Sequence, residues 1–357
     1  MSNCKICKAR EIRSNQISVD LPTFAHSNFK LINKSSKYKI CKNCGLISVL
    51  PNRNSLKFLK SLSSKKYIYS NQSDQIKSFK KKSLKTREEL QYNYLKKYLN
   101  KKNFNLLDIG CFNGKLIKII KRYNYKNNIF AYDTNKYLRK FFKESNIKFS
   151  NKLNFNKIFD YIIISHSLQY IPNIQYFFQK IEKIINNETL IFIQLPNLNK
   201  NIFNHSFGDQ YYLFSKEFLY NLSYKFNFKV IKFEENYFSN EILMVIKKND
   251  IISKKITKIK KINSFIKLKK IKNKLKRLEG KFYVFGTSIN SAFINSYLKE
   301  RNLGFVDENP KKKIFINKMV FLPSSLKKSV KIIFTYNGNN SLKKRLKRRF
   351  SKNLISI

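Results

Sequence analysis

Short apolar runs alternate along most of this chain with segments whose apolar residues recur every three or four positions. The first helical pattern begins near Thr86, and it places Leu90, Tyr94, Leu95 and Leu99 on one face. Strand and helix candidates then alternate in the order NLLDIG, GKLIKIIKRY, NIFAYD, KYLRKFFKES, FDYIIIS, IQYFFQKIEKII, TLIFIQLP and SKEFLYNLSYKF, followed by the strand pair KVIKFEEN and ILMVIKK. Short apolar strands that alternate with helices predict an α/β fold with a doubly wound, mostly parallel sheet.

A second α/β pattern begins at Gly280, with the strand KFYVFG, the helix INSAFINSYLKE and the strand LGFVDENP. The Lys- and Ile-rich stretch between the two patterns holds neither Pro nor Gly, which predicts a basic amphipathic helix. A length of 357 residues also suits more than one domain. We therefore expect an N-terminal module at 1–70, an α/β domain at 71–250, a helical connector at 251–278 and a second α/β domain at 279–357.

Four of the five cysteines form two pairs, Cys4-x-x-Cys7 and Cys41-x-x-Cys44. The polar start MSNCKICKAR resembles no signal peptide, and no apolar run reaches the ~18 residues that a membrane helix needs. We expect a cytoplasmic protein, where paired CxxC motifs indicate zinc rather than disulfides. Four thiolates fill a tetrahedral shell, so the predicted zinc ion is structural.

The formal charge of +53 has two interpretations. Such an excess of Lys and Arg is typical of a nucleic-acid partner. Alanine, however, occurs at only four positions, whereas Lys, Asn, Ile, Phe and Tyr are abundant, as in proteins encoded by A/T-rich genomes. We favour base composition, and anionic small substrates suit either interpretation.

The turn DIGCFNG carries the chemistry of the first α/β unit. Asp108 ends a predicted strand, and Gly110 and Gly114 follow before a helix whose free N–H groups can face a carboxylate. Ligands of open parallel sheets bind at such strand ends. An acid at the position of Asp108 would repel a pyrophosphate and suits a cationic ligand. Asp133 ends the next strand, where a carboxylate can accept hydrogen bonds from both hydroxyls of a ribose.

At these residues the chain resembles the class I S-adenosylmethionine-dependent methyltransferases. LLDIGCFNG is similar to their first motif, AYD to their second and FDYIIISHSLQYIPN to their fourth. The resemblance implies a seven-stranded sheet and S-adenosyl-L-methionine as cofactor. The cofactor-binding residues that it implies are Asp108, Gly110, Cys111, Asn113, Gly114, Asp133 and Ser165.

The order of parts resembles the sugar C-methyltransferase family, whose members have an N-terminal zinc module and a C-terminal Rossmann-like α/β domain. Those enzymes methylate nucleotide-linked keto-deoxysugars, which implies a nucleotide sugar as acceptor and a role in polysaccharide or nucleotide-sugar biosynthesis. The second α/β unit departs from a nucleotide fingerprint, because Ser288 stands where a second glycine would follow Gly286. We expect Gly286 and Ser288 to help hold the substrate.

The loop NHSFGDQYYLFSKEF departs from the Tyr-x-Glu-His type of motif in that family. Alignment on Phe214 and Ser215 puts Asp209 and Gln210 where Glu and His stand in the family. This substitution leaves C-, O- and N-methylation open. The candidates for the general base are Asp209, His166 and His205, and the candidates for positioning the acceptor are Gln210, Tyr211 and Tyr212.

Two other functions stay open. An RNA methyltransferase with a zinc module fits the charge, but base-amino methyltransferases usually carry an Asn/Asp-Pro-Pro-aromatic motif where this chain has Ser165-His166-Ser167-Leu168. A non-catalytic binding protein that retains the methyltransferase fold fits the altered loop. The sequence does not specify the acceptor atom or the oligomeric state.

Overall fold

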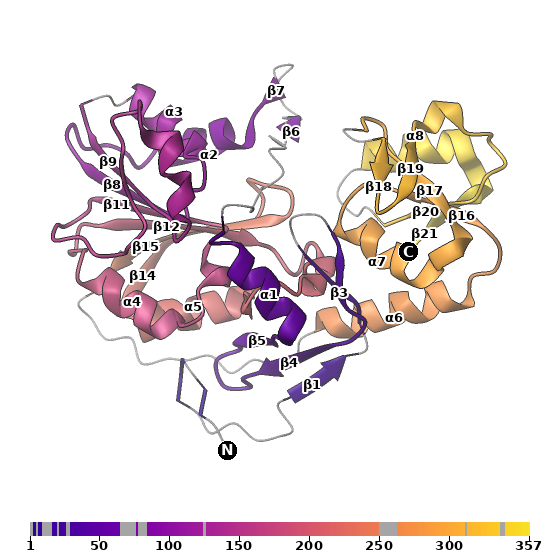
Figure 1. Cartoon of the computed structure of the whole chain (residues 1–357), viewed down its shortest axis with the longest axis horizontal. Coiled ribbons are helices and arrows are strands. Elements are labelled where there is room, and N and C mark those ends of the chain that lie inside the picture. The colour runs from indigo at the N-terminus through magenta and orange to yellow at the C-terminus, as the bar shows by residue number, and fades with distance from the viewer. Residues whose placement is uncertain are drawn as a thin grey trace.

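The computed structural model describes residues 3–4, 6–8, 16–19, 21–25, 29–64, 76–77, 84–123, 126–249, 263–310, 313–335 and 340–357. Over these ranges the chain forms an N-terminal module, a large α/β domain and a C-terminal α/β domain (Figure 1). No helix within the described ranges is long and apolar enough to cross a membrane.

The large domain is built on a seven-stranded sheet in the order β10-β9-β8-β11-β12-β15-β14. Its strands are β8 (Asn105–Ile109), β9 (Asn128–Tyr132), β10 (Lys148–Ser150), β11 (Tyr161–Ser165), β12 (Leu190–Pro196), β14 (Phe228–Glu234) and β15 (Glu241–Lys248). The pairs from β10 to β12 are parallel, whereas β15 is antiparallel to both of its neighbours. The predicted doubly wound sheet and its antiparallel strand pair are confirmed.

The helices of this domain largely follow the predicted pattern. They are α2 (Arg87–Leu95), α3 (Lys115–Tyr123), α4 (Ile174–Glu182) and α5 (Lys216–Lys225). Thr86 begins α2 with a capping box, because its hydroxyl accepts from the N–H of Glu89 and the Glu89 carboxylate accepts from the N–H of Thr86. The segment KYLRKFFKES differs from its prediction: it forms the 3₁₀ turn η2 (Lys136–Phe142) and buries only Leu138 and Phe142. Most of its residues are good helix formers, but so short a helix depends on packing, and this segment buries little of its surface.

The N-terminal module takes one strand from the large domain. Its sheet has the order β1-β4-β5-β13, where β13 (Tyr212–Leu213) follows the seven-stranded sheet's β12 in the sequence. The other strands are β1 (Gln16–Val19), β4 (Ser36–Ile40) and β5 (Ile47–Leu50), and the module also contains β2 (Thr23–Phe24), β3 (Leu31–Asn33) and α1 (Arg53–Ser61). A short hairpin of β6 (Ile76–Lys77) and β7 (Leu84–Lys85) precedes α2. The predicted module therefore shares its sheet with the methyltransferase-like domain.

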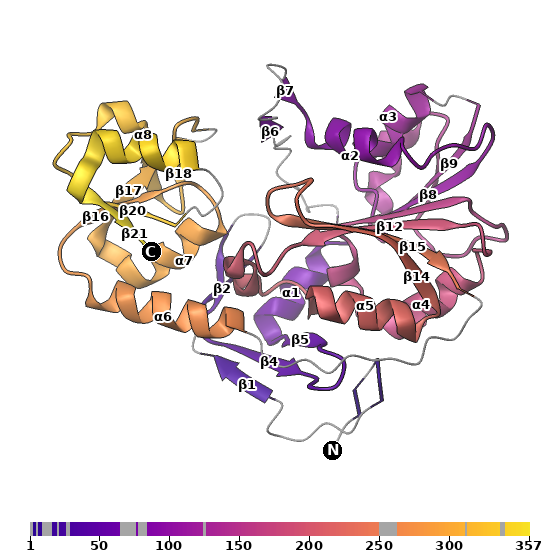
Figure 2. The same ribbon diagram turned by 180° about the vertical axis from the view of Figure 1, so that it is seen from behind.

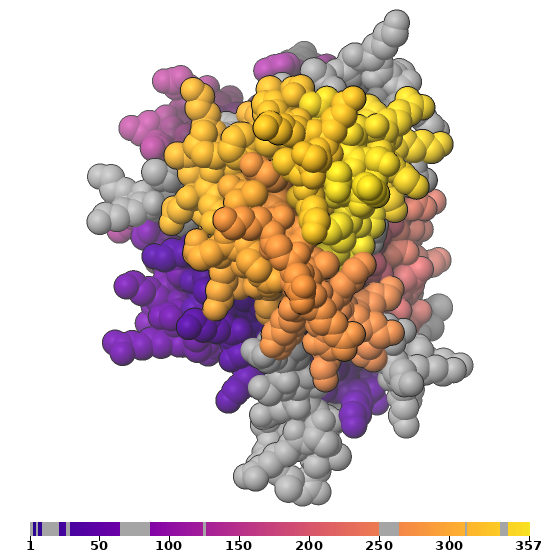
Figure 3. Space-filling model, turned by 90° about the vertical axis from the view of Figure 1, so that its right-hand side faces the viewer, coloured from indigo at the N-terminus to yellow at the C-terminus, as the bar shows by residue number. Residues whose placement is uncertain are grey.

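The C-terminal domain has a six-stranded, mostly parallel sheet in the order β18-β19-β17-β16-β20-β21. Its elements are α6 (Asn263–Arg277), β16 (Phe282–Phe285), α7 (Ile289–Leu298), β17 (Asn302–Val306), β18 (Ile314–Phe315), β19 (Lys318–Phe321), β20 (Ile332–Phe334), α8 (Asn340–Phe350) and β21 (Leu354–Ser356). Helix α6 falls within the predicted connector, and the first part of that connector, residues 251–262, lies outside the described residues. Figure 2 shows α6 passing under the C-terminal domain toward the N-terminal module, and Figure 3 shows that α6 and the domain form one continuous surface on that side.

One apolar cluster joins the three parts of the molecule. Tyr38 of β4 packs on Phe265 of α6 with ring centroids 4.9 Å apart. Phe203, in the turn η4 (Ile202–Ser206) after β12, packs on Phe293 of α7 at 5.2 Å. The segment that follows β12 is consequently enclosed by the N-terminal module and by the C-terminal domain.

Candidate functional site

The turn after β8 depends on two glycines in the left-handed region of backbone conformation. Gly110 has a φ of +76°, and a Cβ there would lie 2.3 Å from the Cβ of Ser167. Gly114 has a φ of +70°, and a Cβ there would lie 2.3 Å from the ring of Phe142. Both positions combine a positive φ with a close approach, which only glycine tolerates without strain. The turn thus packs against the loop after β11 and begins α3.

Asp108 and Asp133 end the neighbouring strands β8 and β9. Strand β8 is buried on both faces, as expected for the centre of a parallel sheet, and Asp108 is only 4% exposed. Burial, together with the charge of Asp133, raises the pKa of Asp108 to about 7. Burial also raises the pKa of Asp133, although backbone N–H groups of Asn135 and Phe112 donate to its carboxylate at 2.9 and 3.3 Å and oppose the shift. Two neighbouring acids, one buried and one half-buried, favour a ligand that brings positive charge and hydrogen-bond donors.

A cleft of about 360 Å³ opens at this edge of the sheet. Six of the seven predicted cofactor residues line it, namely Asp108, Gly110, Cys111, Asn113, Asp133 and Ser165. Gly114 is not part of the lining and contributes the start of α3. Leu62, just after α1, also lines the cleft, so the N-terminal module forms part of its wall. The volume falls in the range of small-molecule sites.

His166 is the one candidate base that lines this cleft. It follows β11 in a left-handed conformation, with φ +52°, and its backbone N–H donates to the carbonyl of Gln194 at 2.9 Å. Its Nε2 lies 3.2 Å from a carboxylate oxygen of Glu241. Burial, and then the charge of Arg87, lower the pKa of His166 below its ordinary value, while Glu241 opposes them. The ring is therefore neutral near pH 7 and able to accept a proton.

The structure places the loop candidates away from this cleft. Asp209 and His205 are 3% and 0% exposed, and neither belongs to the lining of the cleft. His205 packs on Phe265 of α6 at 4.4 Å, and burial lowers its pKa to about 3. Next to Asp209, the N–H of Gly208 donates to the carbonyl of Phe24 at 3.0 Å.

The acceptor-positioning candidates of the same loop support the wall of the cleft from behind. Gln210, Tyr211 and Tyr212 do not line it. The N–H of Tyr211 donates to the carbonyl of Gln169 at 2.9 Å, and the Tyr212 hydroxyl donates to the carbonyl of Pro172 at 2.8 Å. Pro172 itself lines the cleft. The loop is therefore linked to the cleft wall through backbone carbonyls.

Gly286 and Ser288 lie at the end of β16 in the C-terminal domain, outside the lining of the cleft. Gly286 has a φ of +90°, and its N–H donates to the carbonyl of Val306 at 2.7 Å. Ser288 is the N-cap residue of α7, and its side chain makes no capping hydrogen bond. The turn joins the strand β16 to the helix α7, as predicted from the sequence, and its role in holding a substrate stays a prediction.

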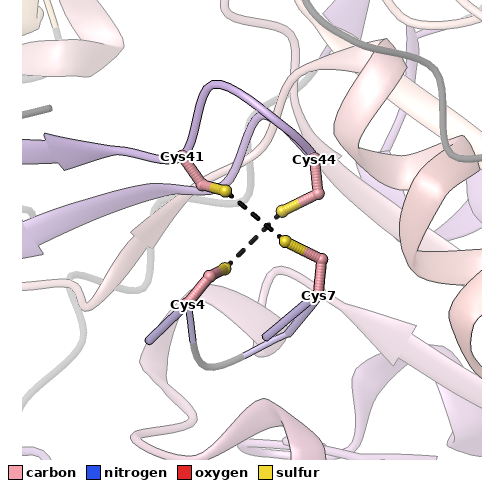
Figure 4. A group of neighbouring side chains, drawn as sticks. All are labelled: Cys4, Cys7, Cys41 and Cys44. Atoms are coloured by element: carbon pink, nitrogen blue, oxygen red, sulfur yellow. Dashed lines mark hydrogen bonds between the residues drawn. The ribbon is translucent and has the colours of Figure 1, made fainter. Parts of the chain in front are cut away.

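The four paired cysteines meet at one point. Two knuckle turns bring the sulfurs of Cys4, Cys7, Cys41 and Cys44 toward a common centre (Figure 4), and all four lie within 4.8 Å of one another. The Sγ atoms of Cys4 and Cys44 are 3.7 Å apart, and those of Cys7 and Cys41 are 3.5 Å apart. Four sulfurs at ~2.3 Å from one zinc ion would be about 3.8 Å apart, so the donor set fits a tetrahedral metal ion.

The second cysteine knuckle also contacts the large domain. The side-chain amide of Asn221, in α5, donates to the carbonyl of Cys44 at 3.0 Å, and both residues are buried. Gly45 adopts a φ of +80° and donates to the carbonyl of Cys41 at 2.7 Å, which closes the knuckle turn. The cysteine cluster is therefore packed into the core of the methyltransferase-like domain.

Sequence reasoning missed the polar network behind His166. Arg87 and Glu241 form an ion pair at 2.9 Å, and the side-chain amide of Gln194 also donates to Glu241. Gln91 donates to Gln194 at 2.6 Å and to Ser165 at 2.9 Å. One signal was available: a strand antiparallel to β12 begins at the same edge where β12 ends, so its first residue, Glu241, had to lie near the cleft.

A sequence model described as a methyltransferase domain matches residues 80–232. The sheet order, the acids at two adjacent strand ends and this match together identify the large domain as an S-adenosylmethionine-dependent methyltransferase domain. No curated protein sequence matches the chain significantly.

Several solved structures are similar to part of this chain. The PH0226 protein from Pyrococcus horikoshii OT3 is 19% identical, with a TM-score of 0.40 over 46% of this chain and 90% of that chain. An S-adenosylmethionine-dependent methyltransferase from Clostridium acetobutylicum ATCC 824 is 12% identical, with a TM-score of 0.38 over 45% and 90%. The plantazolicin methyltransferase BpumL, in complex with a monoazolic desmethylPZN analog and SAH, is 17% identical, with a TM-score of 0.38 over 45% and 82%. These similarities concern the fold of less than half of this chain and leave its acceptor open.

Proposed function

We propose that this methyltransferase acts on a small anionic acceptor, namely a nucleotide-linked sugar. The observation that carries the proposal is the cleft itself, a space of about 360 Å³ lined by the buried Asp108, the half-buried Asp133 and a neutral histidine. The formal charge of +53 favours an anionic acceptor over a cationic one. In the C-terminal domain, Gly286, Ser288 and the N-terminus of α7 would hold the phosphates of such an acceptor.

The residues of the cleft suit S-adenosyl-L-methionine, which supplies an electrophilic methyl group when bound. Asp108 would pair with its ammonium group, and Asp133 would accept hydrogen bonds from the ribose hydroxyls. The free N–H groups at the start of α3, after Gly114, would face its carboxylate. Cys111, Asn113 and Ser165 complete the lining that surrounds this ligand.

His166 would act as the general base for the acceptor. As the acceptor atom forms its bond to the methyl carbon, the bond from that carbon to sulfur breaks and the proton of the acceptor passes to the imidazole. The sulfur keeps the electrons of the broken bond and becomes neutral, and the imidazole holds the proton. Asp209 and His205 remain the alternatives of the sequence prediction, but each would need its enclosed loop to open.

We further propose that the four-cysteine cluster binds structural zinc. Four thiolates with this spacing are the usual ligands of a closed tetrahedral zinc site, which leaves no open position for a substrate. The ion would hold the two knuckle turns against α5 and keep β5 in place beside β13.

We predict that the affinity for the cofactor depends on pH because of the buried acid Asp108. Its pKa of about 7 means that it is largely protonated at pH 6 in the free protein, whereas an ammonium partner requires the carboxylate. Binding must therefore release a proton below pH 7, and the affinity should rise by up to about tenfold per pH unit until it levels off near pH 7. Calorimetry in two buffers with different ionisation enthalpies measures this proton release.

An Asp108→Asn variant provides the control. It should bind S-adenosylmethionine more weakly and with a smaller slope between about pH 5.5 and 7, because the carboxylate of Asp108 no longer titrates. An equal slope in the wild type and in the variant would show that another group pairs with the ammonium.

The acceptor class can be tested directly with methyl-labelled S-adenosylmethionine. We expect transfer to one or more nucleotide sugars, including nucleotide-linked keto-deoxysugars, and none to the free sugars or to nucleoside diphosphates alone. The high charge favours one competing outcome, methylation of RNA. Label in structured RNA that persists at about 200 mM salt, where non-specific contacts have weakened greatly, would support that alternative. Absence of label in every nucleotide sugar would refute the proposed acceptor.

A further inference from the structure

Glu241 lies against His166, which lines the cofactor cleft. It is the first residue of β15, and because β15 is antiparallel to β12, it lies at the carboxyl edge of the parallel strands, opposite Pro196. Its side chain is only 18% exposed. A carboxylate buried beside a ligand site costs free energy unless its partners compensate it.

Three side chains from three different elements surround this carboxylate. Arg87, at the start of α2, donates to Oε1 at 2.9 Å, and Gln194, in β12, donates to Oε2. The Nε2 atom of His166 lies 3.2 Å from the same Oε2. Although burial raises the pKa of Glu241, Arg87 and His166 outweigh it and hold that pKa at about 2. The carboxylate is therefore permanently charged and fixed in place.

The contact determines which nitrogen of His166 faces the cleft. Nε2 is turned toward the carboxylate and away from solvent. The two atoms are close but not aligned for a hydrogen bond, and a small rotation of the ring would align them. Nδ1 makes no hydrogen bond among the described residues and is not enclosed by them. The main chain of His166 is held in its left-handed conformation by the hydrogen bond to Gln194, which fixes where the side chain leaves the backbone.

We propose that Glu241 is a positioning residue for His166, which fixes the tautomer with the proton on Nε2 and leaves Nδ1 free to accept the proton of the methyl acceptor. This inference rests on the proposed role of His166 as base. The same carboxylate stabilises the imidazolium that forms when Nδ1 takes the proton. Arg87 and Gln194 act one step further away, because they keep the carboxylate from turning toward solvent.

The arrangement narrows the class of acceptor. A neutral histidine held by a carboxylate is useful where the acceptor must lose a proton, as a sugar hydroxyl or a carbon next to a carbonyl must. A thiolate or a neutral amine needs no such base before it attacks. The geometry therefore favours O- or C-methylation over methylation of an amine.

Histidine NMR tests the inference without any acceptor. The chain has only three histidines, so the ring nitrogens of the ¹⁵N-labelled full-length protein can be assigned with His205→Asn and His166→Asn variants. In the wild type we expect the proton of neutral His166 on Nε2. In Glu241→Gln the pKa of His166 should fall, because Arg87 and burial then act without the opposing carboxylate. Glu188→Gln, which removes an exposed acid paired with Lys247, should leave the His166 signals unchanged.

Kinetics provide the second readout. With an acceptor that the wild type methylates, Glu241→Gln should reduce kcat by at least about tenfold, while KM and the affinity for S-adenosylmethionine stay within about twofold of the wild type. Glu241→Asp should recover part of the lost kcat. A wild-type His166 with its proton on Nδ1, or a pKa that Glu241→Gln does not move, would overturn the inference. If no acceptor is methylated, the proposed function fails, while the NMR result still decides the role of Glu241. Because the wild-type tautomer needs no variant, the test also stands if Glu241→Gln does not fold.

Discussion

A Cys41→Ser variant is expected to lose its metal ion and to unfold the N-terminal module. Serine offers no thiolate, so the cluster keeps three of its four ligands. Structural zinc contributes on the order of 10 kcal/mol to the folding of small zinc modules, which is comparable with the whole stability of a typical domain. Elemental analysis should show less than one zinc per chain, and thermal unfolding should show an early transition.

The effect should extend to the cofactor cleft. β5, which follows the second knuckle, pairs with β13, and Tyr211 and Tyr212 bind the carbonyls of Gln169 and Pro172 at the cleft wall. Loss of the metal should therefore weaken S-adenosylmethionine binding although no cysteine of the cluster lines the cleft.

The fifth cysteine provides the matched control for metal content. Cys111→Ser should retain one zinc per chain, because Cys111 lies in the cofactor cleft and not in the cluster. Wild-type protein purified without chelator that contains no zinc would contradict the assignment. So would a Cys41→Ser protein with a full complement of zinc and an unchanged unfolding transition.

The sequence specified the large domain well because its signals are local. The run LLDI is apolar on both faces except at Asp108, and this is the pattern of a central parallel strand that ends in a functional acid. The capping box that begins α2 and the glycines after β8 are equally short-range features. Where the local signal was weak, as in KYLRKFFKES, the structure forms a 3₁₀ turn instead of the predicted helix.

The candidate site was only partly predictable because its polar network joins distant segments. Arg87 and Glu241 are 154 positions apart in the sequence, and neither lies in a recognisable motif. The sequence places candidate catalytic and acceptor-positioning residues in the segment after β12, and the structure encloses that segment. Its density of aromatic and apolar residues, in IFNHSFGDQYYLF, was the available signal that it is buried. Alignment to a family motif cannot show that another part of the chain covers a loop.

A His166→Asn variant is expected to lose turnover by a factor of roughly 10²–10⁴, which is the contribution of a well-placed general base. Its affinity for S-adenosylmethionine should change little, because the proposed cofactor contacts come from Asp108, Asp133 and the turn after β8. In the wild type, kcat/KM for the acceptor should fall as the pH drops through the pKa of His166, since only the neutral ring accepts a proton. Burial and Arg87 lower that pKa, so the acid limb should lie below pH ~6.5. The measurement is made with saturating S-adenosylmethionine, because Asp108 is then already ionised and does not contribute to the limb.

Asp209→Asn is the comparison that separates the candidate bases. Asp209 lies in the loop that the N-terminal module encloses, outside the lining of the cleft. Its replacement should leave the acid limb of the pH profile in place. Each variant removes one candidate base: His166 lines the cleft, whereas Asp209 lies outside its lining. If Asp209→Asn abolished turnover and His166→Asn retained both turnover and the acid limb, the base would be Asp209, and the enclosed loop would have to open for each catalytic cycle.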